Sequence, residues 1–258
     1  MIQSKNMKWY LAALLLVLLL AQAGCKKEHE KKHWGYTGDT APAYWYNLDP
    51  AYAIAKDGKA QSPVNIVTAD LTAEGPAKPE FHYQAVKFEV ENNGHTIEGL
   101  PEHGAENYII LDKERYNLQQ FHFHAASEHQ INGKETPMEV HLVHKTAAGG
   151  LAVVGILIEA GKENAGLKEL FAKMPAKEHS KNNLDGEINL ADLLTGTKEI
   201  YRYDGSLTTP PCSEGVKWSL SAQTIELSKE QINAFKGIYN GNNRPVQSLY
   251  ERKIYIAK

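Results

Sequence analysis

Three histidines and a carboxylate lie within ten residues of the chain, in the segment QFHFHAASEH from Gln120 to His129. Histidine is a common metal ligand and carries protons near neutral pH. Side chains two residues apart in a β-strand point to the same face, so His122 and His124 would share one face and two phenylalanines the other. Two imidazoles opposite two apolar rings indicate that their face is not core.

A third histidine with the same parity, His141, stands in the following segment MEVHLVHKT. If the two segments are neighbouring strands, three imidazoles converge and leave the fourth tetrahedral position open, as catalytic zinc sites require. Gln120 and Glu139 each precede a proposed ligand by two residues, where they could hold its second ring nitrogen. His129 and His144 fall outside this register, and we interpret them as structural.

The elements that would position these residues are mostly strands from residue 85 onward. Alternating or β-branched patterns mark AVKFEVE, HTIEGL, NYIILD, YNLQQFHFH and MEVHLVHKT, and GLAVVGILIEAG predicts a strand covered on both faces. Helices are predicted from Asn164 to Met174 and from Ser228 to Ile238, with Ser228 as N-cap. The pattern favours a mainly β, single domain on a large antiparallel sheet with short peripheral helices.

The N-terminus has the pattern of a signal peptide. Two lysines precede an apolar run at residues 11–21, which is too short to span a bilayer but suits an h-region. AQA is a site for ordinary cleavage, whereas AGC resembles the end of a bacterial lipobox with Cys25 acylated. We expect an exported, periplasmic or cell-envelope protein, with or without a lipid anchor. The expected parts are a signal peptide at 1–24, a charged tether at 25–32 and the folded domain at 33–258.

The net charge and the cysteine content limit which molecules the protein is expected to bind and which disulfides it can form. The formal net charge is −3, and loss of the leader with its two lysines makes the chain more acidic. A mildly acidic protein has no electrostatic reason to bind nucleic acid or anionic lipid. The only other cysteine is Cys212, which has no disulfide partner if Cys25 is acylated.

The chain resembles the α-class carbonic anhydrases from about His33 to near the C-terminus. Eight segments occur in family order: HWGY, QSPVNI, NNGHT, QFHFH, SEH, EVHLVH, SLTTPPC and NNRPVQ. The resemblance implies a twisted, mostly antiparallel sheet of about ten strands and a funnel-shaped cleft with Zn²⁺ at its base. It also implies reversible hydration of CO2 to bicarbonate and a proton, and similarity to exported bacterial members suggests a homodimer.

The resemblance implies a role for each matched residue. His122, His124 and His141 would bind Zn²⁺, and a zinc-bound hydroxide would attack CO2. Thr208 would accept a hydrogen bond from this hydroxide and donate its own proton to Glu128. The remaining matches would line the substrate pocket: Val143, Val153, Leu207, Val216 and Trp218 on the hydrophobic wall, and Thr209 on the polar side.

Proton release would use a histidine shuttle. His95 matches that shuttle, and Tyr36 and Asn93 match residues that order its water chain. Glu98 stands where many relatives have an amide, and a carboxylate near His95 would raise its pKa. We therefore expect the shuttle to release protons best at slightly alkaline pH.

One departure and two alternatives accompany the resemblance. Many exported bacterial members pair a cysteine before QSP with the one after TTPP, but AIAKDGKAQSPV contains none, so that disulfide cannot form. HFHAASE also satisfies the H-x-H-x3-E pattern of cupins, which would predict an Fe or Mn oxygenase or isomerase in a small barrel. The third hypothesis is a non-catalytic carbonic-anhydrase-like binding module.

Overall fold

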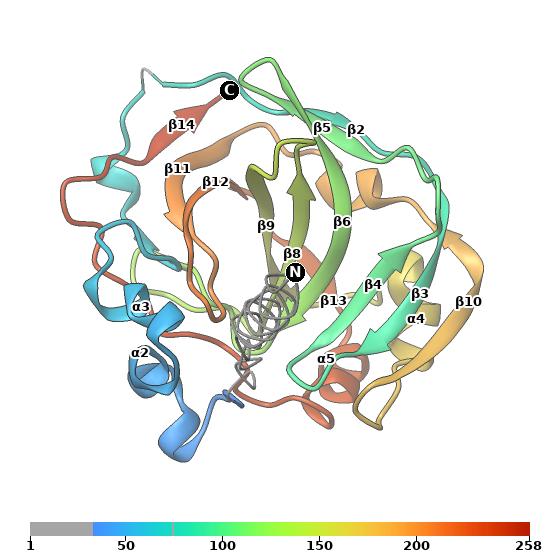
Figure 1. Ribbon diagram of the computed structural model, residues 1–258. Coiled ribbons are helices and arrows are strands. Elements are labelled where there is room, and N and C mark those ends of the chain that lie inside the picture. The colour runs from blue at the N-terminus through green and yellow to red at the C-terminus, as the bar shows by residue number, and fades with distance from the viewer. Residues whose placement is uncertain (1–32, 74) are drawn as a thin grey trace, which may run out of the picture. The chain divides into compact units, whose positions relative to one another are not determined.

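The computed structural model describes residues 33–73 and 75–258, and His33–Lys258 forms one compact unit (Figure 1). The predicted signal peptide, tether and lipidation site at Cys25 lie outside the described residues. Within the described ranges, no helix is long and apolar enough to cross a membrane.

A twelve-stranded sheet is the framework of this unit, where the sequence predicted about ten strands. Its main path runs through β10 (Ser180–Ile188), β3 (Val86–Asn92), β4 (Ile97–Pro101), β6 (Glu114–His124), β8 (Met138–Lys145), β9 (Leu151–Ala160), β12 (Glu214–Ser221), β11 (Ile200–Ser206) and β14 (Tyr255–Ala257). β13 (Ile225–Leu227) pairs with β9, β5 (Tyr108–Leu111) pairs with β6, and β2 (Glu80–His82) pairs with β5. β9 pairs in parallel with β12 and β13, and the other pairs of this sheet are antiparallel, as predicted. A separate parallel pair joins β1 (Asn65–Ile66) to β7 (Gln130–Ile131).

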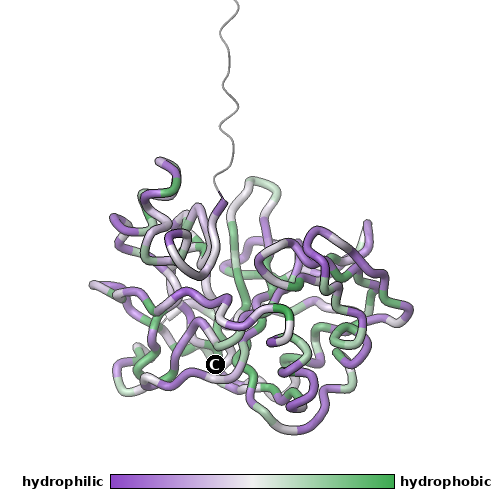
Figure 2. The backbone as a smooth tube through the Cα atoms, turned by 90° about the horizontal axis from the view of Figure 1, so that it is seen from below, coloured by the Kyte–Doolittle hydropathy of each residue, from purple (hydrophilic) through white to green (hydrophobic). Residues whose placement is uncertain are grey.

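β9 is buried on both faces, as its nearly continuous apolar sequence predicted. Alternate residues along it, Val154 and Ile156 among them, belong to a large hydrophobic cluster that contains Phe121 and Phe123. Val153 faces the other way, into a second cluster. The sheet therefore has a core on each side of its central strands, and Figure 2 shows the hydrophobic stretches running among more hydrophilic loops.

Both predicted helices exist, although they are shorter than predicted. α5 (Lys229–Lys236) begins with a capping box in which the Ser228 and Gln231 side chains accept each other's backbone N–H bonds. α4 (Lys168–Ala172) follows the 3₁₀ turn η5 (Ala165–Leu167). The other short helical segments are η1 (Gly38–Thr40), η2 (Pro42–Tyr44), α2 (Trp45–Leu48), η3 (Pro50–Tyr52), α3 (Ile54–Asp57), η4 (Thr68–Asp70) and η6 (Leu190–Leu194).

The helices α4 and α5 cover the apolar side of β6. The ring of Phe123 lies 5.3 Å from that of Phe171 in α4 and 6.0 Å from that of Phe235 in α5. This packing fixes which face of β6 is core, so the histidines that alternate with the phenylalanines must point to the opposite face.

Candidate active site

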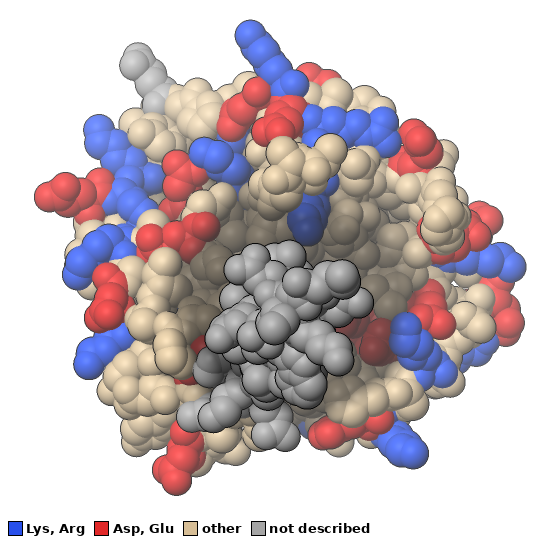
Figure 3. Space-filling model, in the orientation of Figure 1, with Lys and Arg blue, Asp and Glu red and all other residues tan. Residues whose placement is uncertain are grey.

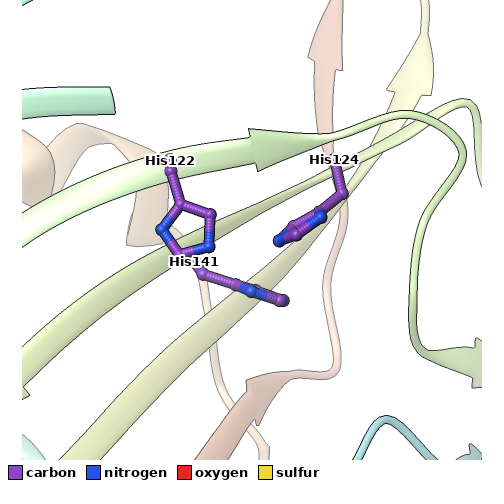
Figure 4. Close-up of side chains that lie close together, drawn as sticks. All are labelled: His122, His124 and His141. Atoms are coloured by element: carbon purple, nitrogen blue, oxygen red, sulfur yellow. The ribbon is translucent and has the colours of Figure 1, made fainter. Parts of the chain in front are cut away.

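Three imidazoles meet on the face of the sheet opposite these helices. β6 and β8 are antiparallel neighbours, and His122 pairs directly with His141 across them. One nitrogen from each of His122, His124 and His141 lies within 4.8 Å of the others, and Figure 4 shows the three rings pointing toward one another. The strand parity that the sequence predicted thus brings together the three residues proposed as metal ligands.

Each of these rings uses one nitrogen in a hydrogen bond and leaves the other toward the centre. The three bonds join His122 Nδ1 to Gln120 Oε1 at 2.8 Å, His124 Nδ1 to the Asn242 carbonyl oxygen at 2.7 Å, and His141 Nε2 to Glu139 Oε1 at 2.8 Å. Because these partners are acceptors, they keep the protons on the outer nitrogens. Nε2 of the first two rings and Nδ1 of the third are left as lone-pair donors.

The chemistry of this donor set fits a metal ion. Nε2 of His124 is buried without a hydrogen-bond partner. Burial lowers the pKa of all three histidines, to about 4 for His124, and the neighbouring rings lower that of His122 further. Three neutral imidazoles with inward lone pairs are the ligands of a catalytic zinc site with an open fourth position.

Glu139 is the buried anchor of this arrangement. Its Oε2 accepts the backbone N–H groups of Glu128 at 2.9 Å and His129 at 2.8 Å. Its Oε1 accepts from His129 Nδ1 at 2.7 Å and from His141 Nε2. Burial alone would raise the pKa of Glu139, but the two imidazoles hold it well below its ordinary value. Because these groups bond one another, they form a charged support behind His141 and not a second ligand set.

Glu128 lies beside the inward nitrogens. Its Oε1 accepts the backbone N–H of Arg244 at 2.8 Å, and its Oε2 lies 3.5 Å from His124 Nε2 and 3.9 Å from His141 Nδ1. Burial raises the pKa of Glu128 to about 7, while His141 and the Thr208 hydroxyl act in the opposite direction. Oε2 has no hydrogen-bond partner of normal geometry. The Thr208 hydroxyl is therefore close enough to affect Glu128, but the expected hydrogen bond between the two side chains does not have normal geometry.

The residues expected to form the hydrophobic wall lie in one cluster next to the histidines. Val153, Val216 and Trp218 are buried in it, and Val143 and Leu207 pack against it, partly exposed. The Trp218 ring lies 4.9 Å from that of His141, and Thr209, expected on the polar side, is half-buried. Where the surface is visible in Figure 3, its deeper part is largely uncharged, and the charged side chains gather toward the rim.

The expected proton path has a half-buried histidine at its outer end. The imidazole of His95 stacks on the indole of Trp34, with ring centroids 3.7 Å apart. Asn93 accepts the backbone N–H of His95 at 2.9 Å and donates from its amide to Glu98 at 2.7 Å. Tyr36 packs edge-on against Trp34, and burial raises its pKa well above the ordinary value. The four residues expected on the proton path therefore lie around one turn: His95, Asn93, Glu98 and Tyr36.

The expected electrostatic effect of Glu98 on this histidine is wrong. Burial lowers the pKa of His95, and His33 and His179 lower it further, while only Glu178 among the nearby charged groups raises it. Glu98 is itself desolvated, which raises its own pKa, and its carboxylate accepts from Asn93 instead of pairing with the imidazole. Burial of His95, which the sequence pattern did not reveal, is the largest cause of the lowered pKa.

Asn242 is a site residue whose role sequence reasoning missed. Its carbonyl oxygen holds His124, its side-chain oxygen accepts the Ala125 N–H at 2.9 Å, and its amide donates to the carbonyls of Phe123 at 3.1 Å and His95 at 3.2 Å. One side chain thus links the end of β6 to the turn that carries His95. The motif NNRPVQ was the available signal, but these contacts span more than a hundred residues.

The two histidines outside the strand register have bonding partners in the core. His129 Nε2 is bonded to the Tyr203 hydroxyl at 2.6 Å, and His144 Nε2 to the Tyr83 hydroxyl at 2.8 Å. Both imidazoles are completely buried, as a structural role requires. Cys212 is buried and has no disulfide partner among the residues that the structure describes.

The fold and the three converging imidazoles define a single-metal site on a large β-sheet. Residues 40–258 match the family model described as eukaryotic-type carbonic anhydrase. The chain belongs to the α-carbonic anhydrase family. The cupin alternative is therefore wrong, because a cupin would require a small barrel in place of this sheet.

Relatives match over most of their length. A carbonic anhydrase of Pectobacterium atrosepticum is 38% identical over 240 residues, which cover 93% of this chain and 97% of the relative. The solved α-carbonic anhydrase of Thermovibrio ammonificans, in complex with the inhibitor sulfanilamide, has 42% identity and a TM-score of 0.83, with 87% of this chain and 99% of that one covered. A hyperthermostable carbonic anhydrase from a hydrothermal vent chimney has 44% identity and a TM-score of 0.82, with 88% and 100% covered.

Proposed function

We propose that the chain catalyses the zinc-dependent, reversible hydration of CO2 to bicarbonate and a proton. The observation that carries this proposal is the set of three inward imidazole nitrogens, from His122, His124 and His141, in a chain of the α-carbonic anhydrase family. When bound to them, Zn²⁺ acts as a Lewis acid that lowers the pKa of a water to about 7, the value established for carbonic anhydrase.

Gln120, Asn242 and Glu139 act by orienting the ligands. Each accepts a hydrogen bond from the N–H of an outer ring nitrogen, which fixes the tautomer that presents a lone pair inward. Glu139 also brings a negative charge to His141, which makes that imidazole a better electron-pair donor. The strength of metal binding therefore depends on residues that do not touch the metal.

Thr208 and Glu128 act on the nucleophile. With a cation at the inward nitrogens, the ionised form of Glu128 would be favoured, and its carboxylate would accept a hydrogen bond from the Thr208 hydroxyl. The Thr208 oxygen is left as an acceptor toward the site, so it favours a nucleophile that can donate a hydrogen bond. The backbone N–H of Arg244 holds the other carboxylate oxygen in place.

The apolar wall suits a substrate that offers little for hydrogen bonding. CO2 is small and has no net dipole, so a hydrophobic surface beside the nucleophile can hold it without desolvating polar groups. Val143, Val216 and Trp218 supply such a surface next to His141. Bicarbonate is charged and more strongly hydrated, so the same wall favours its release.

His95 carries the released proton outward. Its lowered pKa means that it passes the proton on readily after accepting it from water near Tyr36 and Asn93. Stacking on Trp34 keeps the ring at the boundary between the site and solvent. These two properties support a shuttle role.

The test is a zinc assay together with stopped-flow CO2 hydration, with and without sulfanilamide. We expect one zinc per chain and inhibitor-sensitive activity, and loss of both in His141→Ala. His103→Ala, which alters an exposed histidine, is the matched control and should resemble the wild type. A zinc-loaded wild type with no rate above buffer would favour the non-catalytic binding module.

The proposed place of action is the bacterial cell envelope. The leader pattern of residues 1–24 supports export, and the AGC sequence supports acylation of Cys25. An acylated Cys25 would hold the enzyme at the membrane through the short charged tether before His33.

A further inference from the structure

A cavity lies at β11 and β12, away from the metal ligands. Its volume is about 180 Å³, several times the roughly 30 Å³ that one water occupies in the liquid, so it has room for a small anion. Six charged residues line it: Arg202, Asp112, Asp204, Lys217, Arg252 and Lys253.

Strand parity places Arg202, Asp204 and Lys217 of this cavity on the opposite face of the sheet from the metal ligands. Tyr203 of β11 pairs directly with Trp218 of β12, and the Trp218 ring contacts His141. The next pair, Asp204 with Lys217, must therefore point to the other face. A ligand bound there would not compete with one at the imidazoles.

Arg202 forms the buried floor of the cavity. Its side chain is only 3% exposed. NH1 and NH2 form a bidentate pair with Asp112 at 3.0 and 2.9 Å, and NH1 also donates to the Ala77 carbonyl at 2.8 Å. Nε has no partner. A buried guanidinium N–H without an acceptor destabilises the folded state, so a hydrogen-bond acceptor in the cavity would stabilise it.

The remaining charges leave the cavity cationic. Lys217 pairs with Asp204 at 2.7 Å, which neutralises both. Arg252 donates only to backbone carbonyls, those of Leu249, Asp204, Gln61 and Ser248. Lys253 is exposed and has no ion pair among the described residues. Asp112 and Asp204 are each matched by a cation, so Arg252 and Lys253, which form no ion pair among the described residues, add two further positive charges to the cavity lining.

We propose that this cavity binds a small oxyanion, such as bicarbonate, phosphate or a carboxylate. Because Arg202 Nε has almost no accessible surface, the side chains over it must shift for one oxygen of the anion to accept from it, and the charge of the anion lies between Arg252 and Lys253. Three of the five guanidinium N–H groups of Arg202 are bonded to Asp112 and to the Ala77 carbonyl, which leaves few donors for a ligand, so a single small anion fits better than a polyphosphate. The site is independent of the catalytic proposal, since it uses none of its residues.

Thermal unfolding of the zinc-loaded protein tests the proposal, with phosphate, acetate or bicarbonate each compared with chloride at equal ionic strength. We expect at least one oxyanion to raise the melting temperature of the wild type. The apparent dissociation constant should rise at least tenfold in Lys253→Met and further in Lys217→Met/Lys253→Met. Stabilisation by phosphate alone would identify a tetrahedral ligand, and stabilisation by acetate and bicarbonate a planar one; either supports the site.

Lys162→Met is the matched control, because Lys162 is exposed and its side chain has no ion pair among the residues described. It should keep the wild-type response. Anion binding at the metal site contributes equally in the wild type and in all these variants. A difference in stabilisation between them therefore measures anion binding in the cavity. Absence of oxyanion stabilisation in the wild type, or equal stabilisation in the double variant, would overturn the proposal.

Discussion

Replacing Glu139 with glutamine should weaken zinc binding through a change of tautomer. Four N–H donors converge on this carboxylate: two backbone groups on Oε2 and two imidazoles on Oε1. A glutamine offers one oxygen, and the backbone N–H groups cannot lose their protons, so the oxygen must take the Oε2 position. The NH2 group then faces His129 and His141.

The consequence for His141 follows from this geometry. To accept a hydrogen bond from the NH2 group, Nε2 must give up its proton, and the neutral ring then carries it on Nδ1, the nitrogen that faces the metal position. A protonated Nδ1 cannot ligate. Loss of an orienting partner of a ligand typically costs about 10- to 100-fold in metal affinity, or roughly 1.4 to 2.7 kcal/mol. Loss of the negative charge acts in the same direction.

Competition against a chelator at fixed pH measures the zinc dissociation constant. Glu139→Gln should raise it by about 10- to 100-fold, a range set by the orienting role. Glu159→Gln, the same change at an exposed position of β9, should leave it unchanged. Near-UV circular dichroism establishes that both variants are folded. A folded Glu139→Gln with wild-type zinc affinity would refute the tautomer argument.

Four further outcomes are expected. His95→Ala should lower turnover in dilute buffer at unchanged zinc content, with recovery on addition of imidazole; unchanged low-buffer kinetics would remove it from the proton path. Because burial lowers the pKa of His95, the buffer-limited rate of the wild type should titrate below pH 6.5. Glu98→Gln should not move that titration to lower pH. Burial lowers the pKa of His144 to about 3, so the unfolded chain binds more protons and stability is lost as the pH falls below about 6.5. Urea unfolding should show about 2 kcal/mol of this loss between pH 8 and pH 5, absent in a folded His144→Gln. Labelled palmitate should enter the wild type and not Cys25→Ala.

Local patterns predicted the central part of the site. The two-residue period of β6 and β8 was enough to place three histidines on one face, with Gln120 and Glu139 beside them, because parity within a strand is independent of the rest of the fold. The phenylalanines that alternate with the histidines made the opposite face core. The continuous apolar run of β9 marked a strand buried on both sides in the same way.

Long-range packing determined what local patterns could not predict. The pKa of His95 is lowered by burial and by His33, some sixty residues earlier, so the carboxylate close in sequence was a misleading guide. Asn242 reaches β6 across a separation that no periodicity encodes. Arg202 and Asp112 form their cavity only because β11 returns to the turn between β5 and β6.

The long sequence separation between the histidines and the groups that orient them has a consequence for how the enzyme matures. Asn242 and Arg244 hold His124 and Glu128 from a segment that is synthesised more than a hundred residues later. A nascent or truncated chain that lacks this segment has the histidines but not the groups that orient them. Metal loading should therefore follow synthesis of the segment that carries Asn242 and Arg244, and a chain truncated before residue 242 should bind zinc poorly even where its strands form.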